Sequence, residues 1–167
     1  MKLSAAVFTI SDSSHSGSRE DLTGPRLQLC LNKAGFEIVL TRILPDEAQQ
    51  IALALRTAAA QARLVVTTGG TGISPRDVTP EATRSVCDRL LDGVAEFMRA
   101  EGLKQTPFAA LSRGVCGTIG TALVLNLPGN PAGAEQSLKL VLPLIPHALD
   151  LLSGKTEHSA APHTQPT

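Results

Sequence analysis

The chain has 167 residues, a formal net charge of zero and 43% hydrophobic residues, which suits one globular domain with a core of its own. It contains no Trp or Tyr. A balanced charge without aromatic stacking platforms argues against nucleic acid as a partner. No apolar stretch reaches the roughly 18 residues that a membrane helix needs.

Three cysteines, Cys30, Cys87 and Cys116, lie far apart and form no Cys-x-x-Cys pair. Their odd number and wide spacing argue against a disulfide framework or a structural zinc site. Each is therefore interpreted as a small buried hydrophobic residue. The cysteine pattern indicates a reduced protein. Because the apolar run near the N-terminus is short and turns polar at Ser11, we also expect the protein to be soluble and cytoplasmic.

Apolar segments of strand length alternate with segments of helical periodicity, which is typical of an α/β domain with a mainly parallel sheet. Strands are predicted at residues 5–10, 37–44, 64–68, 109–111 and 122–127. Helices are predicted at residues 25–35, 48–61, 79–91, 94–106 and 132–152, the last with kinks at Pro143 and Pro146. The polar segment 153–167 is predicted to be a disordered C-terminal tail.

The segment after the third predicted strand reads TTGGTGISPRDVTPEAT. Gly69, Gly70 and Gly72 let the backbone come close to a ligand, and open α/β sheets bind their ligands at the carboxyl ends of parallel strands. The Lys of a P-loop and the third glycine of a dinucleotide fingerprint are both absent. Two interpretations remain, a site for a phosphate-rich ligand or a structural turn.

Asp46 and Asp77 lie in loops that follow different predicted strands, and Asp12 follows another. Taken singly, Asp46 and Asp77 have an ordinary interpretation as helix-start residues, since capping and the helix dipole favour acids there. Taken together at one edge of the sheet, they form a candidate Mg²⁺ site, with Asp12 as a third contributor. Magnesium needs only one or two carboxylates plus substrate phosphates.

Two more segments contain candidate polar residues. Ser112 follows Leu111 and precedes Arg113, but it has no sequence context of a nucleophile, so we expect it to act as a hydroxyl donor. The segment Pro-Gly-Asn-Pro at 128–131 is ordinary turn chemistry directly before the last predicted helix.

The order and spacing of five segments resemble the molybdenum-cofactor biosynthesis family that includes MogA, MoaB and the gephyrin G domain. These segments are TISDSSHSGSREDLTGPRL, ILPDE, TTGGTGISPRDVTPEATR, TPFAALSRG and LVLNLPGNPAGAEQSLKLVLPLIPHALDLL. The first and fourth look more like the adenylyltransferase branch, which includes MogA, than like MoaB. The resemblance implies a MoaB/Mog-type molybdopterin-binding domain at residues 1–152, built as a three-layer α/β fold with a mostly parallel central sheet and helices on both faces.

The resemblance also implies an activity. It is the adenylylation of molybdopterin by Mg-ATP with release of pyrophosphate, carried out by a homotrimer that passes its product to a MoeA-like molybdenum-insertion protein. The alternatives are a MoaB-like paralogue or a non-catalytic trimeric scaffold, either of which binds the pterin without efficient transfer.

The resemblance implies a role for each candidate residue. Asp46, Ser112 and Asp77 are the implied catalytic residues, with Asp46 and Asp77 also placed to hold Mg²⁺. The residues implied to bind molybdopterin or nucleotide are Ser11, Asp12, Gly69, Gly70, Thr71, Gly72, Pro128, Gly129 and Asn130.

Overall fold

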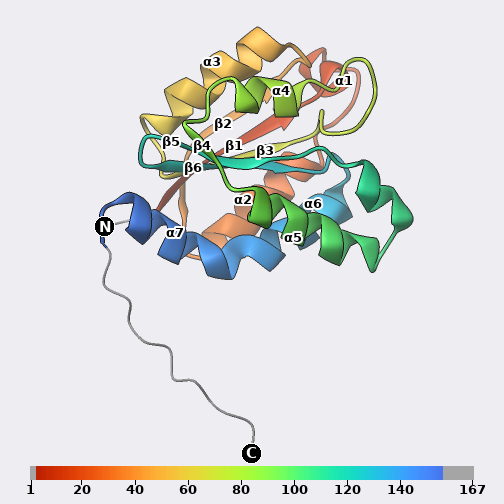
Figure 1. Ribbon diagram of the computed structural model, residues 1–167. Helices are drawn as coiled ribbons and strands as arrows, with labels where there is room; N and C mark the ends of the chain where they lie inside the picture. Colours follow the sequence, from red (N-terminus) through yellow and green to blue (C-terminus); the bar gives the residue numbers. More distant parts are fainter. Residues whose placement is uncertain (1–2, 156–167) are drawn as a thin grey trace, which may run out of the picture.

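A computed structural model describes residues 3–155, in which a six-stranded sheet lies between two groups of helices (Figure 1). The strands are β1 Ser4–Ile10, β2 Glu37–Leu44, β3 Leu64–Thr68, β4 Arg89–Leu90, β5 Cys116–Ile119 and β6 Ala122–Leu127. Their order is β2-β1-β3-β6-β5-β4, with the first four parallel and β5 antiparallel to both of its neighbours. The predicted three-layer α/β class is confirmed.

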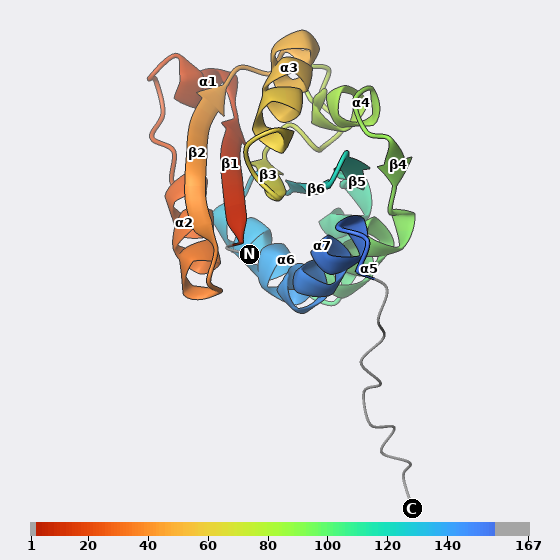
Figure 2. The same cartoon turned by 90° about the vertical axis from the view of Figure 1, so that its left-hand side faces the viewer.

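The helices are divided between the two faces of the sheet. They are α1 Asp12–His15, α2 Thr23–Lys33, α3 Ala48–Ala59, α4 Thr79–Arg84, α5 Asp92–Leu103, α6 Pro131–Val141 and α7 Ile145–Leu152, with 3₁₀ helices η1 Pro107–Leu111 and η2 Leu142–Leu144. Figures 1 and 2 show α3 and α4 on one face and α2, α5, α6 and α7 on the other. Within residues 3–155, no helix has the length and apolar character to cross a membrane.

The central strands are buried on both faces, so alternate side chains enter different cores. In β1, Ala5 and Val7 belong to the core that includes Leu27 of α2 and Leu138 of α6. Ala6, Phe8 and Ile10 belong to the core that includes Ile51 of α3 and Ala82 of α4. This two-sided burial explains why the parallel strands read as continuous apolar runs.

The strand order places a topological switch point between β1 and β3. From β1 the chain moves to β2 on one side, and it then crosses back to β3 on the other side of β1. Open α/β sheets bind their ligands at the carboxyl ends of the strands beside such a switch point. The loops that follow β1 and β3 therefore lie next to each other.

The predicted strand at residues 109–111 is wrong, because these residues belong to the 3₁₀ helix η1. Thr106 occupies the N-cap position, where its hydroxyl accepts a hydrogen bond from the Phe108 N–H at 3.3 Å. Pro107 follows at the first helical position, which its fixed backbone angle suits. These local signals for a helix start were present in the sequence.

The helix predicted at residues 79–91 ends at Arg84, because the chain then forms the edge strand β4. Strands β4 and β5 were not predicted. Both are short, and β5 contains Gly117, so neither shows the apolar run of a buried parallel strand. A two-residue connection with Gly120 at φ +55° joins β5 to β6, and this hairpin signal was the one that could have revealed β5.

The predicted last helix is one helical segment interrupted at its prolines, as expected. Pro143 lies in the first turn of η2 and Pro146 in the first turn of α7. The segment predicted as a tail begins at Ser153, which accepts a hydrogen bond from Arg63 at 2.7 Å and donates one to the Leu149 carbonyl at 2.8 Å. The tail beyond residue 155 lies outside the described residues.

The cysteines form no disulfide within the described part of the chain, and Cys30 and Cys116 are buried as predicted. Cys87 is half-buried. Burial raises the pKa of Cys87 to about 11 and that of Cys116 to about 12. Both thiols therefore stay protonated at neutral pH and are poor nucleophiles.

Candidate functional site

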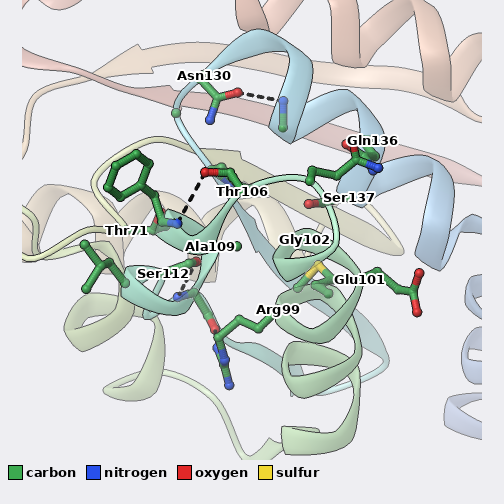
Figure 3. A pocket seen from close by; sticks show the side chains of 18 of the residues that line it. Thr71, Arg99, Glu101, Gly102, Thr106, Ala109, Ser112, Asn130, Gln136 and Ser137 are labelled. Atoms are coloured by element: carbon green, nitrogen blue, oxygen red, sulfur yellow. Dashed lines mark hydrogen bonds between the residues drawn. The ribbon is translucent and has the colours of Figure 1, made fainter.

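A pocket of about 540 Å³ opens where the carboxyl ends of β3 and β6 meet helices α5, η1 and α6 (Figure 3). The predicted binding and catalytic residues that line it are Thr71, Gly72, Ser112, Pro128, Gly129 and Asn130. The other predicted residues, which lie outside its lining, are Ser11, Asp12, Asp46, Gly69, Gly70 and Asp77. The structure thus divides the predicted site into two neighbouring parts.

The loop at residues 69–78, called the glycine loop here, begins with a close approach of three strand ends. Gly69 has φ +96°, and a β-carbon at this position would lie 2.2 Å from the carbonyl oxygen of Ile10 at the end of β1. Its N–H donates to the carbonyl of Leu127 at the end of β6, at 3.2 Å. No residue with a side chain fits here without moving the strand ends apart.

The next residue joins the glycine loop to α4. Gly70 has φ +62°, and a β-carbon there would lie 2.4 Å from Thr79 Oγ1 and 2.9 Å from Asp46 Oδ1. Thr79 donates its hydroxyl to the Gly69 carbonyl and its N–H to the Gly70 carbonyl. Val78 occupies the N-cap position of α4, and the Thr79 hydroxyl bonds to the loop and not to the helix end.

Asp12 and Asp46 are held together by two reciprocal hydrogen bonds. The Asp12 N–H donates to Asp46 Oδ2 and the Asp46 N–H donates to Asp12 Oδ1, each at 2.9 Å. Arg76 of the glycine loop adds a bidentate pair to Asp12, with both nitrogens 2.9 Å from the carboxylate. Asp46 therefore links two loops and is not the N-cap of α3, a position that Glu47 occupies.

The two carboxylates differ in their electrostatics. The hydrogen bonds from Arg76 and from the backbone of Asp46 lower the pKa of Asp12 below its ordinary value. Burial raises the pKa of Asp46, and the negative charges of Asp12 and Asp77 add to this effect. Asp12 is therefore an ionised acid whose charge is paired with Arg76, whereas burial and the neighbouring acids disfavour the charged form of Asp46 unless a positive charge approaches.

Asp77 and Ser11 stabilise turns in the loops that follow β3 and β1. Asp77 Oδ2 accepts the N–H of Ser74 at 2.9 Å, so its carboxylate closes a turn inside the glycine loop and faces Gly72. It is not a helix cap. Ser11 is the N-cap of α1, where its hydroxyl accepts the N–H of Ser14 at 3.2 Å.

Ser112 and Asn130 lie on the wall of the pocket. Ser112 follows the last residue of η1, and its hydroxyl lies 3.5 Å from the N–H of Gly114, a long contact that leaves the hydroxyl group able to bind a ligand. Asn130 is the N-cap of α6 and accepts the N–H of Gly133 at 2.7 Å (Figure 3). Residues 128–130 therefore connect β6 to α6, and all three line the pocket.

The acidic residues suit Mg²⁺ only when substrate phosphates complete its ligands. Among residues 3–155, no three His, Cys, Asp or Glu side chains lie close enough to hold a metal ion by themselves. Asp46 uses Oδ2 for the Asp12 N–H, while its Oδ1 faces Gly70. One or two carboxylates are sufficient for a magnesium ion that is bound together with phosphates, so Asp46 and Asp77 fit that kind of site.

Several pocket residues were missed in the sequence. Arg99 of α5 and Gln136 and Ser137 of α6 contribute polar groups to the lining (Figure 3). In α6, Gly133, Gln136, Ser137 and Leu140 recur at helical spacing after Asn130, which was a usable signal for one face. No comparable signal marked Arg99, because α5 lies far from the predicted loops in the sequence.

Asn126 was also missed, although an amide inside the apolar strand ALVLNL is unusual. It is 1% exposed and donates to the hydroxyls of Thr67 and Thr83 at 2.9 and 3.0 Å. Its carbonyl oxygen accepts the N–H of Val115 at 3.2 Å. A fully hydrogen-bonded buried amide fixes β6 against β3 and α4, and Asn126 lies in the lining of the pocket.

Comparison with known proteins agrees with this architecture. Residues 6–147 match the family described as the probable molybdopterin binding domain. The chain is 41% identical over 155 residues to the molybdopterin adenylyltransferase of Helicobacter pylori strain J99, covering 89% of this chain and 86% of that protein. The crystal structure of the molybdopterin biosynthesis enzyme MoaB from Thermus thermophilus has a TM-score of 0.86 and 47% identity, covering 92% of this chain and 98% of that one.

A longer relative contains a domain of this kind as one part. The chain is 39% identical over 149 residues to the molybdenum cofactor synthesis protein cinnamon of Drosophila melanogaster, covering 87% of this chain. It spans only 25% of the length of cinnamon.

Gly70→Ala tests whether the glycine loop is sterically fixed. Gly17 is a matched control, because it also has a positive φ, +79°, but a β-carbon there meets nothing within 4 Å. Both substitutions should lower the free energy of unfolding by about 1–2 kcal/mol, because alanine disfavours a left-handed backbone. Gly70→Ala should lower it by about 1–3 kcal/mol more, because its methyl group overlaps Thr79 and Asp46. Urea unfolding measures both, and equal costs would contradict a sterically fixed loop.

Proposed function

The chain belongs to the probable molybdopterin binding domain family, and we propose that it catalyses the adenylylation of molybdopterin by Mg-ATP with release of pyrophosphate. The observation that carries this proposal is the position of the glycine loop. Its residues Thr71 and Gly72 line the pocket, while Gly70 and Gly72 face Asp46 and Asp77. The Helicobacter pylori relative, named a molybdopterin adenylyltransferase, supports the same activity.

The reaction requires alignment of two anions and no side-chain nucleophile. An oxygen of the terminal phosphate of molybdopterin attacks the α-phosphorus of ATP, a new P–O bond forms, and the bond to pyrophosphate breaks. In this proposal the pterin occupies the pocket, and its phosphate reaches the glycine loop. Backbone N–H groups of the loop and of the α6 N-terminus, together with the Ser112 hydroxyl, donate to substrate oxygens.

The acids form the other side of the reaction centre. Asp46, together with Asp77, would hold Mg²⁺, which offsets phosphate charge when it is bound with ATP. Asp12 supports Asp46 through their reciprocal hydrogen bonds. Ser11 and Gly69 shape the edge on which the nucleotide would lie, and Pro128, Gly129 and Asn130 do so on the pterin side. We further propose a cytoplasmic location and transfer of the product to a MoeA-like insertion protein.

A second candidate is pterin binding without efficient transfer, either as a MoaB-like paralogue or as a trimeric scaffold. The chain is 47% identical to a protein named MoaB, which supports the MoaB-like alternative. Purified protein incubated with molybdopterin and Mg-ATP should release pyrophosphate in proportion to the molybdopterin consumed. Tight molybdopterin binding without pyrophosphate release would instead support the second candidate.

Asp46→Asn should separate a catalytic role of Asp46 from a structural one. The amide keeps an oxygen that accepts the Asp12 N–H but removes the negative charge, so turnover should fall about a hundredfold or more. Molybdopterin binding should be retained. Asp88→Asn is the matched control, since Asp88 also accepts a backbone N–H, from Gly120 at 2.7 Å, but lies on the β4–β5 edge. Near-normal turnover of a folded Asp46→Asn protein would remove Asp46 from the catalytic residues.

The same variant should not lose stability at neutral pH. Because the folded-state pKa of Asp46 lies above its ordinary value, the wild-type protein loses stability as the pH rises from the ordinary carboxyl pKa through the raised one. Asp46→Asn removes this loss, so chemical unfolding at pH 7 should show equal or greater stability. Lower stability at pH 7 would indicate that the carboxylate is structural.

We also propose a homotrimer. The family resemblance supports it, and so do large apolar side chains at the surface, such as Leu53, Ile73 and Phe108, which are 67%, 68% and 75% exposed. Sedimentation at micromolar concentration should give about 52 kDa, three times the chain mass of 17.4 kDa. A dilution series provides the control, because a real assembly dissociates reversibly. A monomer across the whole series would contradict the proposal.

A further inference from the structure

Arg113 connects the pocket wall to the glycine loop through both its backbone and its side chain. Its N–H donates to the carbonyl of Thr71 at 2.8 Å, and its Nε donates to the carbonyl of Gly72 at 2.7 Å. Its Nη2 donates to the carbonyl of Asp77 at 2.8 Å, and its Nη1 pairs with the Glu81 carboxylate in the first turn of α4. All these acceptors lie in the glycine loop or directly after it.

These contacts join parts of the site that are far apart in the sequence. Ser112, the residue before Arg113, lines the pocket together with Thr71 and Gly72. Asp77 lies on the acidic side of the loop. One guanidinium therefore links Gly72, Asp77 and Glu81 to the segment that carries Ser112, and its donors point in fixed directions. The single ammonium of Lys cannot reproduce this geometry.

Adenylyl transfer is sensitive to this kind of positioning. A misplacement of about 1 Å in the groups that align the reactants can lower the rate about a hundredfold. In the proposed function, backbone N–H groups of the loop bind the phosphates, and Arg113 holds Thr71, Gly72 and Asp77 of the same loop. A shift of Gly72 or Asp77 would therefore alter the alignment of the two substrates without removing any group that contacts them.

We propose that Arg113 is a positioning residue for adenylyl transfer, which fixes the glycine loop against the pocket wall that carries Ser112. This inference rests on the proposed function for its effect on the rate. Its effect on the loop itself is independent of the activity.

The chain offers a matched control in Arg63. This residue also donates to several groups, with Nε 3.1 Å from the Thr121 carbonyl and Nη2 2.7 Å from the Leu149 carbonyl. It lies at the amino end of β3, opposite the glycine loop. Arg63→Lys should therefore weaken packing to a similar extent as Arg113→Lys while leaving the glycine loop in place.

The experiment compares the full-length wild type with Arg113→Lys and Arg63→Lys. Three quantities are measured: kcat and the KM for molybdopterin, the thermal midpoint, and the amide hydrogen exchange of peptides covering residues 69–79. In Arg113→Lys, kcat should fall about a hundredfold. The KM for molybdopterin should stay within about threefold, and exchange in residues 69–79 should accelerate at least about tenfold. Arg63→Lys should lower only the thermal midpoint.

Each outcome decides a defined point. A folded Arg113→Lys protein with kcat within about threefold of the wild type, or with unchanged loop exchange, overturns the positioning role. If the wild type releases no pyrophosphate, the proposed function fails, and the exchange comparison alone decides the role of Arg113. If Arg113→Lys does not fold, Glu81→Ala removes one of the same contacts. Unchanged kcat and loop exchange in that variant would overturn the inference, whereas a parallel change in both supports it.

Discussion

The site depends on the close approach of Gly69, directly after β3, to the carbonyl of Ile10 at the end of β1. This approach brings the ends of β1 and β3 so near that only a glycine fits between them. The rest of the site depends on this approach, because the loop after β1 carries Ser11 and Asp12 while the loop after β3 carries the glycines and Asp77. If these strand ends were farther apart, the acids and the glycine loop would not share one edge of the sheet.

The same edge gives three aspartates different properties. Asp12 is paired with Arg76, which lowers its pKa, while burial and the neighbouring acids raise the pKa of Asp46. Asp77 closes a turn through the N–H of Ser74. Residue type alone does not distinguish these roles, because each depends on the donors and charges that the fold brings to the carboxylate.

The division of the site into a pocket and an acidic edge matches the needs of a transfer between two anionic substrates. A pterin requires a concave surface with a few polar groups, which α5, η1 and α6 provide around Ser112. A triphosphate requires backbone donors and a means of offsetting charge. The glycine loop borders both regions, so it is the part of the chain where the two substrates of the proposed reaction would meet.

The sequence by itself determined the parallel strands, the main helices and the approximate positions of the glycine loop and Asp46, because these depend on local periodicity and on glycine and proline signals. The resemblance added the candidate residues and the expected chemistry. Thr106 and Pro107 already carried a local signal for η1, and Gly120 carried one for the β5–β6 hairpin. Only the tertiary structure decided that the short segment β4 extends the sheet and that Asp46 binds Asp12 instead of capping α3. The contacts of Arg113 and the place of Arg99 in the pocket were decided there too, since they join residues that no local pattern relates.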